Sequence, residues 1–539
     1  MRASRHSVLG ALAFLVLLTI VGTWPQGAFL RSKVARHSDS YFSMWRLAWV
    51  AHALRTDPRH VFDANIFHPE VRTLAYSDAT LLEGTIAAPL LWAGVPAVLV
   101  YNILLLSGFA VSGVGMFVLA RYLTGSFGAA LVSATVFMLA PFRLEHFMHL
   151  ELQWAMWMPL AFWAVHRAID EGSWTFGTLA GLFVWLQIVS CVYYGIFLAM
   201  LAVVLVALLA MLDVRRARAA WPGLLFGAIL AAALTWPYAS PYLQTAQALG
   251  PRDPAEIARY SAHPINYLAA ARQNLLWGWT ADRFGANEMR LFPGVVALLL
   301  ALAALTHRRR RFVWIYLVLC AAAVELSFGT NGWLYGWLFS HVRAQGLRAP
   351  ARFAIVASCA LAVMAGFGID AVRERLRDAR RSRALLVAVL AMLTIEYMPK
   401  WMRLMTVPSH APDVYKLIST MGDGVVVELP MPVPEGLPGD EATYAFWSAA
   451  HWHPLVNGYS GYYPPTYIET LSRMRTFPDD ESIARLRQLD VRFIVVHRHF
   501  FESEEYLSLI QQMLKRPELK PGGRFSDPAE EAQLFELTR

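Results

Sequence analysis

Asp39 is the residue of this sequence whose setting best suits acid–base chemistry. It lies in the run Ser38-Asp39-Ser40, directly before a stretch with apolar and aromatic residues at helical spacing, 41–54. A carboxylate that is partly desolvated at the start of such a helix can act as a general base and take a proton from a hydroxyl group. A second interpretation is structural, because each of these three residues could cap the N-terminus of the helix.

A short segment, 142–153, concentrates charged and metal-binding side chains. They are Arg143, Glu145, His146, His149 and Glu151. On a helix, Glu145 and His149 share a face at the i, i+4 spacing. The two glutamates and two histidines are therefore candidate ligands of a divalent metal such as Mg or Mn, and Arg143 is a candidate phosphate contact. The alternative is a polar turn at the membrane surface that binds nothing.

Two arginines stand where an apolar segment begins, in the run 348–353. A charged side chain at such a position is costly unless it is paired or reaches the membrane interface. The planar guanidinium also suits bidentate binding of a phosphate. Arg348 and Arg352 are therefore candidate ligands of a lipid phosphate, and the alternative is that they only reach toward the interface.

An aromatic segment rich in Gly and Pro, 451–465, has the composition of a carbohydrate-binding surface. Aromatic rings stack on sugar faces, and polar side chains bond to the hydroxyl groups. Candidate contacts of a sugar or an acceptor are His451, His453, Asn457 and Tyr459. A structured loop without a ligand fits the composition equally well. The sequence has no Walker motif and no GxSxG motif, so nucleotide hydrolysis is not expected.

The elements that must position these residues are mostly membrane helices. Of the 539 residues, 57% are hydrophobic and 16% are charged, whereas soluble proteins carry about 25% charged residues. The apolar runs are long enough to cross a hydrocarbon core of roughly 30 Å as helices. We predict a polytopic α-helical membrane protein with about eleven transmembrane helices. The expected spans are 8–24, 97–120, 127–141, 154–168, 174–190, 193–212, 220–238, 292–306, 312–328, 351–370 and 384–401.

The placement of basic residues predicts the orientation of the chain. The net charge is +8, and arginines cluster in links between apolar segments at 215–218, 308–311 and 373–383. Such clusters are usual on the cytoplasmic side, beside anionic lipid, so the N-terminus is expected inside and no nucleic acid is expected as a partner. Three basic residues within 31–36 fall on the outer side against this trend. The three cysteines lie in or beside apolar segments, so no disulfide framework is expected.

This orientation predicts two domains. Residues 1–404 are expected to form the transmembrane domain with a large first outer loop, 25–96, and 405–539 a small C-terminal α/β extracytoplasmic domain. Two β-branched runs of that domain, 424–429 and 491–496, predict strands, and helical stretches lie between and after them.

The outer loop is expected to contact the bilayer. Its stretch 41–54 predicts a helix lying in the membrane interface, with Trp45 and Trp49 at headgroup depth.

The layout resembles the GT-C superfamily of membrane glycosyltransferases, most closely bacterial members of unassigned specificity that include proteins related to the YfhO group. The resemblance rests on Ser38-Asp39-Ser40 with its following helix, on 347–353, and on the segment around Asn457-Gly458-Tyr459. It implies that Asp39 is the catalytic base and that the donor is a polyprenyl-phosphate sugar. The single aspartate departs from the paired aspartates of some relatives, which leaves metal dependence open.

The resemblance also implies a setting and partners. The protein is expected in a bacterial cytoplasmic membrane, in contact with membrane lipid, a lipid-linked donor and a glycan, lipid or protein acceptor. Arg348 or Arg352 would stabilise the charge on the departing phosphate, in an inverting transfer.

Two other classes of protein compete with this interpretation. A transporter, or flippase, of a lipid or polysaccharide intermediate predicts ionisable residues deep within the spans, where Glu325 and Glu396 are the nearest examples. A non-catalytic membrane assembly protein would tolerate loss of Asp39.

Overall fold

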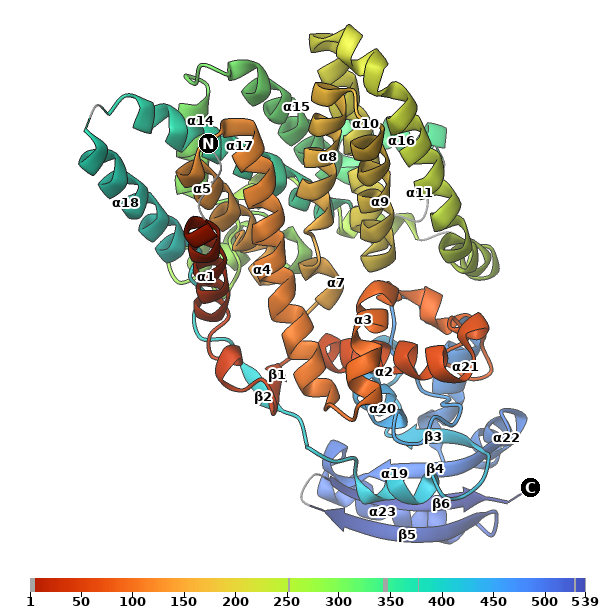
Figure 1. Ribbon diagram of the computed structural model, residues 1–539. Coiled ribbons are helices and arrows are strands. Elements are labelled where there is room, and N and C mark those ends of the chain that lie inside the picture. The colour runs from red at the N-terminus through yellow and green to blue at the C-terminus, as the bar shows by residue number, and fades with distance from the viewer. Residues whose placement is uncertain (1–4, 251–252, 343–347, 377, 528–529, 539) are drawn as a thin grey trace. The chain divides into compact units, whose positions relative to one another are not determined.

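The chain divides into two compact units in the computed structural model, which describes residues 5–250, 253–342, 348–376, 378–527 and 530–538 (Figure 1). The first unit comprises Met1–Leu30 and Asn102–Arg403, and the second comprises Arg31–Tyr101 and Leu404–Arg539. The first outer loop, which we predicted as part of the transmembrane domain, is thus grouped with the C-terminal segment instead. The two units are described in turn.

Every predicted span contains a helix. These helices are α1 (Arg5–Gly22), α4 (Ala97–Thr124), α5 (Phe127–Met138), α8 (Trp157–Glu171), α9 (Trp174–Ser190), α10 (Val192–Leu212), α11 (Val214–Leu249), α14 (Val295–Ala304), α15 (Arg310–Ser327), α17 (Ala354–Glu374) and α18 (Ala379–Tyr397). Within the described residues, five helical runs are long and apolar enough to cross a membrane, and four further apolar helices are shorter. The described part of the chain is therefore mostly helical.

Helix α17 is the centre of the first unit. All its side chains from Ala354 to Ala371 are buried, because it packs against α5, α14 and α15. Small residues allow α9 and α11 to pack closely against each other. A Cβ atom at Gly181 would lie 2.0 Å from the carbonyl oxygen of Gly227, so the two backbones approach more closely than any larger residue would allow.

Short elements connect the long helices of the first unit. They include α6 (Pro141–Glu145), α7 (Leu150–Gln153), α12 (Pro254–Arg259), α13 (Ala281–Phe284), α16 (Trp333–Val342) and the 3-10 turns η4 (Pro264–Leu268), η6 (Asn287–Met289) and η8 (Pro350–Phe353). Most of the candidate residues of this unit lie on α6, α7, η6 and η8.

The second unit joins two helices of the outer loop to the C-terminal segment. Helix α2 (Ser38–Thr56) packs against α3 (Leu81–Trp92) and α20 (Glu441–Ser448). Strand β1 (Lys33–Ala35) pairs with β2 (Leu404–Thr406) in an antiparallel ladder. Trp45 is fully buried and donates a hydrogen bond to Asn65, and Trp49 is 8% exposed. The prediction of 41–54 as an interfacial helix is therefore wrong, because this helix is enclosed by protein.

A four-stranded mixed sheet forms the core of the C-terminal segment. The strands are β3 (Val425–Leu429), β4 (Val491–His497), β5 (Leu519–Asp527) and β6 (Glu530–Leu537), in the order β3-β4-β6-β5. Both predicted strands are present, as the adjacent parallel pair β3 and β4. Helices α21 (Pro465–Arg473) and α22 (Asp480–Gln488) lie on the connection between them, and α19 (Asp413–Ile418) and α23 (Ser503–Leu514) complete the segment. Strand β3 of this sheet is hydrogen-bonded to Asn457, which lies next to the candidate site of the second unit.

Candidate functional site

Asp39 lies in the first turn of α2, and it is not the N-cap. The N-cap is His37, whose Nδ1 accepts a hydrogen bond from the backbone N–H of Asp39. The structural interpretation of Asp39 as the capping residue is therefore wrong. Its negative charge is still favoured there by the partial positive charge of the helix N-terminus.

The carboxylate of Asp39 is held by side chains. The Tyr459 hydroxyl donates a hydrogen bond to Oδ1 over 2.7 Å, and Nδ1 of His37 lies 3.1 Å from Oδ2. When the ring is protonated, Nδ1 donates to Oδ2 instead of accepting from the backbone, and the contact becomes an ion pair. The hydrogen bond between the two side chains raises the pKa of His37. The Asp39 side chain is 14% exposed, so it is largely desolvated and yet reachable.

Tyr459 is the member of the predicted sugar-binding set that the structure joins to Asp39. Burial raises the pKa of the Tyr459 hydroxyl well above its usual value, and the neighbouring Asp39 raises it further. The hydroxyl is therefore protonated at neutral pH and serves as a donor. The ring packs against Phe42 of α2, with centroids 5.1 Å apart.

Asn457 has a structural role within the C-terminal segment. It is fully buried, its Oδ1 accepts a hydrogen bond from the Glu428 backbone N–H, and its Nδ2 donates to the Glu428 carbonyl. A third bond goes from Nδ2 to the Glu441 carboxylate. The amide is thus engaged inside the fold and does not face a sugar, contrary to our expectation for this residue.

His451 and His453 belong to a stack of rings. The centroids of the two imidazoles are 5.2 Å apart, and Tyr415 stacks on His451. Burial lowers the pKa of His451 to about 3, so its ring is neutral. Nδ1 of His451 accepts a hydrogen bond from the His453 backbone, and Nε2 of His453 lies 3.3 Å from the Ile418 carbonyl.

Arg352 in the first unit is bound by a carboxylate that our sequence analysis did not single out. Its Nε and Nη2 donate to the two oxygens of Glu288 over 3.1 and 2.6 Å. Nε2 of the buried His146 lies 3.5 Å from the same carboxylate. Burial alone would raise the pKa of Glu288, but the charge of Arg352 outweighs it and holds the pKa below its ordinary value. The spacing of Glu288 from η8 along the chain gives no signal of this pairing.

The four predicted metal ligands do not form one ligand set. Glu145 is paired with Arg290 and accepts a hydrogen bond from the Arg272 backbone, while His146 faces Glu288. His149 lies 4.0 Å from Glu151. Because Glu145 is committed to an arginine, these side chains do not fit a common divalent cation, and we derive no catalytic step through one.

The other two arginines of the predicted phosphate site differ in accessibility. Arg143 is 1% exposed, donates to the Gln153 carbonyl over 2.7 Å and lies between the rings of Phe109 and Phe137. It joins neighbouring segments and is not accessible to a phosphate, so this part of the prediction is wrong. Arg348 is 31% exposed, and it pairs with Glu256 over 2.8 Å.

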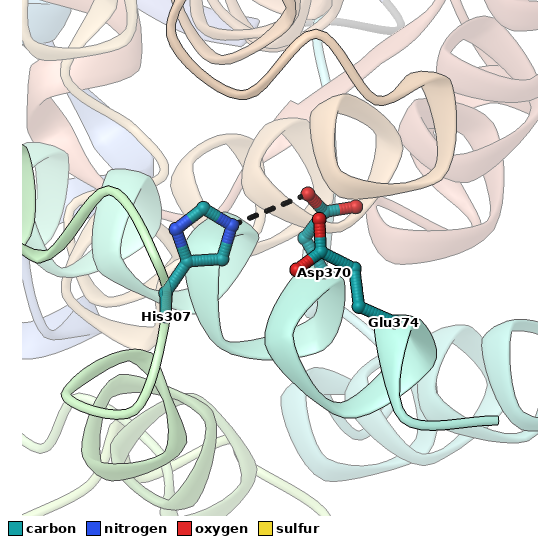
Figure 2. Close-up of side chains that lie close together, drawn as sticks. All are labelled: His307, Asp370 and Glu374. Carbon is teal, nitrogen blue, oxygen red and sulfur yellow. Dashed lines mark ion pairs between the residues drawn. The ribbon is translucent and has the colours of Figure 1, made fainter.

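A separate cluster in the first unit has the composition of a cation site. Across the described ranges, His307, Asp370 and Glu374 form the group of such side chains whose ligand atoms all lie within 4.8 Å of one another. Figure 2 shows the His307 ring directed toward Asp370, with Nε2 3.4 Å from the carboxylate.

The contacts of this cluster favour ion pairing over metal binding. Nδ1 of His307 accepts a hydrogen bond from the Arg309 backbone, so Nε2 of the neutral ring carries the proton and has no lone pair for a metal. Glu374 is paired with Arg308 over 3.0 Å. The cluster is therefore an ion-pair network at the basic end of α17.

Comparison with known proteins assigns the fold. No protein-family model and no curated protein matches the sequence. Solved structures do match, and they show that the chain has the GT-C fold of AftD, AglB and ArnT. The chain is thus a multi-pass membrane protein with the architecture that the sequence resemblance implied.

Three of these structures are informative. Mycobacterial arabinofuranosyltransferase AftD matches all of this chain at 15% identity with a TM-score of 0.62, and the match covers 42% of the AftD chain. The Archaeoglobus fulgidus oligosaccharyltransferase AglB, in complex with an inhibitory peptide and a dolichol-phosphate, matches 97% of this chain and 74% of its own at 12% identity and a TM-score of 0.52. ArnT from Cupriavidus metallidurans matches 99% of this chain and 98% of its own at 14% identity and a TM-score of 0.50. The present chain thus spans less than half of the AftD chain.

Proposed function

We propose that this protein is a glycosyltransferase that moves a sugar from a polyprenyl-phosphate donor to an acceptor at the outer face of a bacterial cytoplasmic membrane. The observation that carries the proposal is the setting of Asp39. Its carboxylate is 14% exposed, accepts a hydrogen bond from Tyr459, and is not used to cap its helix. A desolvated but reachable carboxylate is suited to general-base catalysis.

In the proposed step, Asp39 accepts the proton of the acceptor hydroxyl while the acceptor oxygen attacks the anomeric carbon. A new carbon–oxygen bond forms as the bond between the anomeric carbon and the phosphate oxygen breaks. The polyprenyl phosphate leaves with that electron pair. A single direct displacement of this kind inverts the configuration at the anomeric carbon.

We assign the leaving phosphate to Arg348 and Arg352. A guanidinium stabilises the negative charge that develops on a phosphate and can bind it through two parallel hydrogen bonds. Arg348 is the more accessible, 31% exposed against 15% for Arg352. Both already pair with carboxylates, so an arriving phosphate exchanges with Glu256 or Glu288.

The class of donor is supported by one structural neighbour. AglB was solved with a dolichol-phosphate, which is a polyprenyl phosphate, and the present chain has the same fold. A lipid-linked donor also agrees with the apolar helices of the first unit, since the polyprenyl tail requires a bilayer.

Two internal carboxylates weigh against the transporter alternative. Glu325 accepts hydrogen bonds from the backbone of Trp333 and Leu334 at the start of α16. Glu396 does the same for Val295 and Val296 at the start of α14. Both satisfy helix N-termini that would otherwise lack acceptors, so they are structural groups and not steps of a transport path.

The first test compares wild type with Asp39→Asn in nanodiscs, using a panel of polyprenyl-phosphate hexoses and pentoses and measuring released polyprenyl phosphate. Loss of the base is expected to slow release by about 10²-fold or more. Asp57→Asn is the matched control, because Asp57 follows the other end of the same helix and is 58% exposed. Equal rates in wild type and Asp39→Asn would contradict the assignment of the base, and a wild type that consumes no donor would favour a transporter or an assembly protein.

A further inference from the structure

A buried carboxyl group of α20 is hydrogen-bonded to the two residues that precede Tyr459, the partner of Asp39. Glu441 is fully buried. Its Oε1 accepts a hydrogen bond from Nδ2 of Asn457 over 3.1 Å, and its Oε2 accepts one from the Gly458 backbone over 3.0 Å. An ionisable group is costly to bury without such partners. The arrangement therefore fixes the backbone that leads into Tyr459.

The same segment is held from its other side by the outer loop. The backbone N–H of Phe67 donates to the Asn457 carbonyl, and that of His68 donates to the Leu455 carbonyl. A Cβ atom at Gly458 would lie 2.5 Å from the Phe67 ring, so only glycine permits this approach. Tyr459 thus follows a segment that is held on both sides.

The Tyr459 hydroxyl donates a hydrogen bond to Oδ1 of Asp39 over 2.7 Å. A hydrogen bond donated to a carboxylate favours its charged form and lowers its affinity for a proton. It also restricts the rotation of the carboxylate, because one oxygen is held in place.

We infer that Tyr459 is a positioning residue that orients Asp39 and sets its proton affinity, and that Glu441 holds Tyr459 in register. The C-terminal segment then contributes to the positioning of the base. This inference rests on the proposed role of Asp39. Other titratable or charged groups around the carboxylate and its tyrosine are His37, Arg46 and Tyr463.

The decisive variant is Tyr459→Phe, which removes the hydroxyl and keeps the ring on Phe42. In wild type, kcat/KM for polyprenyl-phosphate sugar should fall at low pH as Asp39 becomes protonated. Without the donated hydrogen bond, the midpoint of this acid limb should rise by ~0.5–1 pH unit. A role confined to packing would lower the rate at all pH values and leave the midpoint in place.

Tyr444→Phe is the matched control. The Tyr444 hydroxyl donates to the Pro430 carbonyl over 3.2 Å in the same segment, so this variant also loses a largely buried hydrogen bond. Its acid limb should coincide with that of wild type. A shift of equal size in both variants would overturn the inference.

A measurement independent of turnover uses thermal unfolding of the full chain in nanodiscs. The shifts in Tm caused by Asp39→Asn and Tyr459→Phe should be less than additive in the double variant, because the first removes the charge of the acceptor and the second removes the donor of the same hydrogen bond. The shifts of Asp39→Asn and Tyr444→Phe should add. Additive shifts for the first pair would refute the inference.

These experiments distinguish the proposed role of Asp39 from the proposed role of Tyr459. If Asp39→Asn abolishes transfer but Tyr459→Phe leaves the acid limb unmoved, the proposed function stands and the positioning role falls. If Asp39→Asn transfers sugar normally, the assignment of Asp39 as the base falls, and the Tm coupling still reports whether Tyr459 holds this carboxylate.

Discussion

Two ionisable residues face each other inside the sheet of the C-terminal segment. Glu428 on β3 and His497 on β4 are almost completely buried, and Oε2 of Glu428 lies 2.5 Å from Nε2 of His497. Burial raises the pKa of Glu428 well above its usual value and lowers that of His497 to about 3. The pair is therefore neutral, with the carboxyl O–H donating to the ring.

This pair predicts how stability depends on pH. In the unfolded chain the two groups titrate near 4.5 and 6.5. From about pH 3 to 4.5 only the unfolded histidine binds an extra proton, so the contribution of the pair to stability rises with pH. From 4.5 to 6.5 the loss of the proton from the unfolded glutamate cancels this effect. Above 6.5 the folded pair retains a proton that the unfolded chain has lost, so stability falls.

Glu428→Gln should remove this fall. In full-length protein in nanodiscs, the protection of β3 and β4 amides against hydrogen exchange should decrease above pH 6.5 in wild type. The variant should reduce the slope by ~1.4 kcal/mol per pH unit. Glu441, whose pKa burial raises to about 8, contributes a fall of the same sign in both proteins. An unchanged slope in the variant would contradict the neutral pairing.

The candidate base could be recognised from the sequence, whereas its partners could not. Asp39 stands out because a polar run precedes an apolar helix. Tyr459 is 420 positions away, and the Glu288–Arg352 pair joins segments 64 positions apart. Such pairings depend on tertiary packing, which the spacing of residue types does not encode. Asn457 lies in a segment whose composition is typical of sugar binding, but its side chain instead forms hydrogen bonds that hold the backbone of the C-terminal segment.

At the scale of elements, the helix of the outer loop that exposes an apolar face is α3 and not α2. The apolar face of α2 is enclosed by α3 and α20, although its sequence is typical of an interfacial helix. Helix α3 contains one charged residue, the buried Glu83, and exposes Ile86, Leu90 and Trp92 by 40–47%. Four residues separate it from the start of α4. The periodicity of the sequence predicted a helix with an apolar face. Whether lipid or protein covers that face depends on the tertiary fold.

We therefore expect the exposed face of α3 to contact acyl chains. A nitroxide attached to Leu90→Cys in nanodiscs should be more accessible to oxygen than to a water-soluble nickel chelate. A label at the exposed Ser419 near α19, introduced as Ser419→Cys, should show the opposite preference. Cys320, the least buried native cysteine, is replaced by alanine in both. Equal accessibility profiles at the two sites would contradict the placement of α3.

At the scale of the whole molecule, the helices were predictable and their grouping was not. Each of the helices in the predicted spans follows from an apolar run, and β3 and β4 follow from β-branched runs. Strand β5 was missed because it contains Pro521, Gly522 and Gly523, which are unfavourable in strands. The assignment of the outer loop to the C-terminal unit depends on contacts such as those of Phe67 with Asn457 and of His68 with Leu455. No local sequence pattern predicts these contacts.

The most direct test of the account asks whether the glycosidic bond of the donor is broken. Purified protein in proteoliposomes is given a polyprenyl-phosphate sugar that is radiolabelled in the sugar, and the lipid products are separated. A glycosyltransferase should release unlabelled polyprenyl phosphate and place the label on an acceptor or, without one, on water. Recovery of the donor intact but on the opposite leaflet would instead establish a transporter and contradict the transferase assignment.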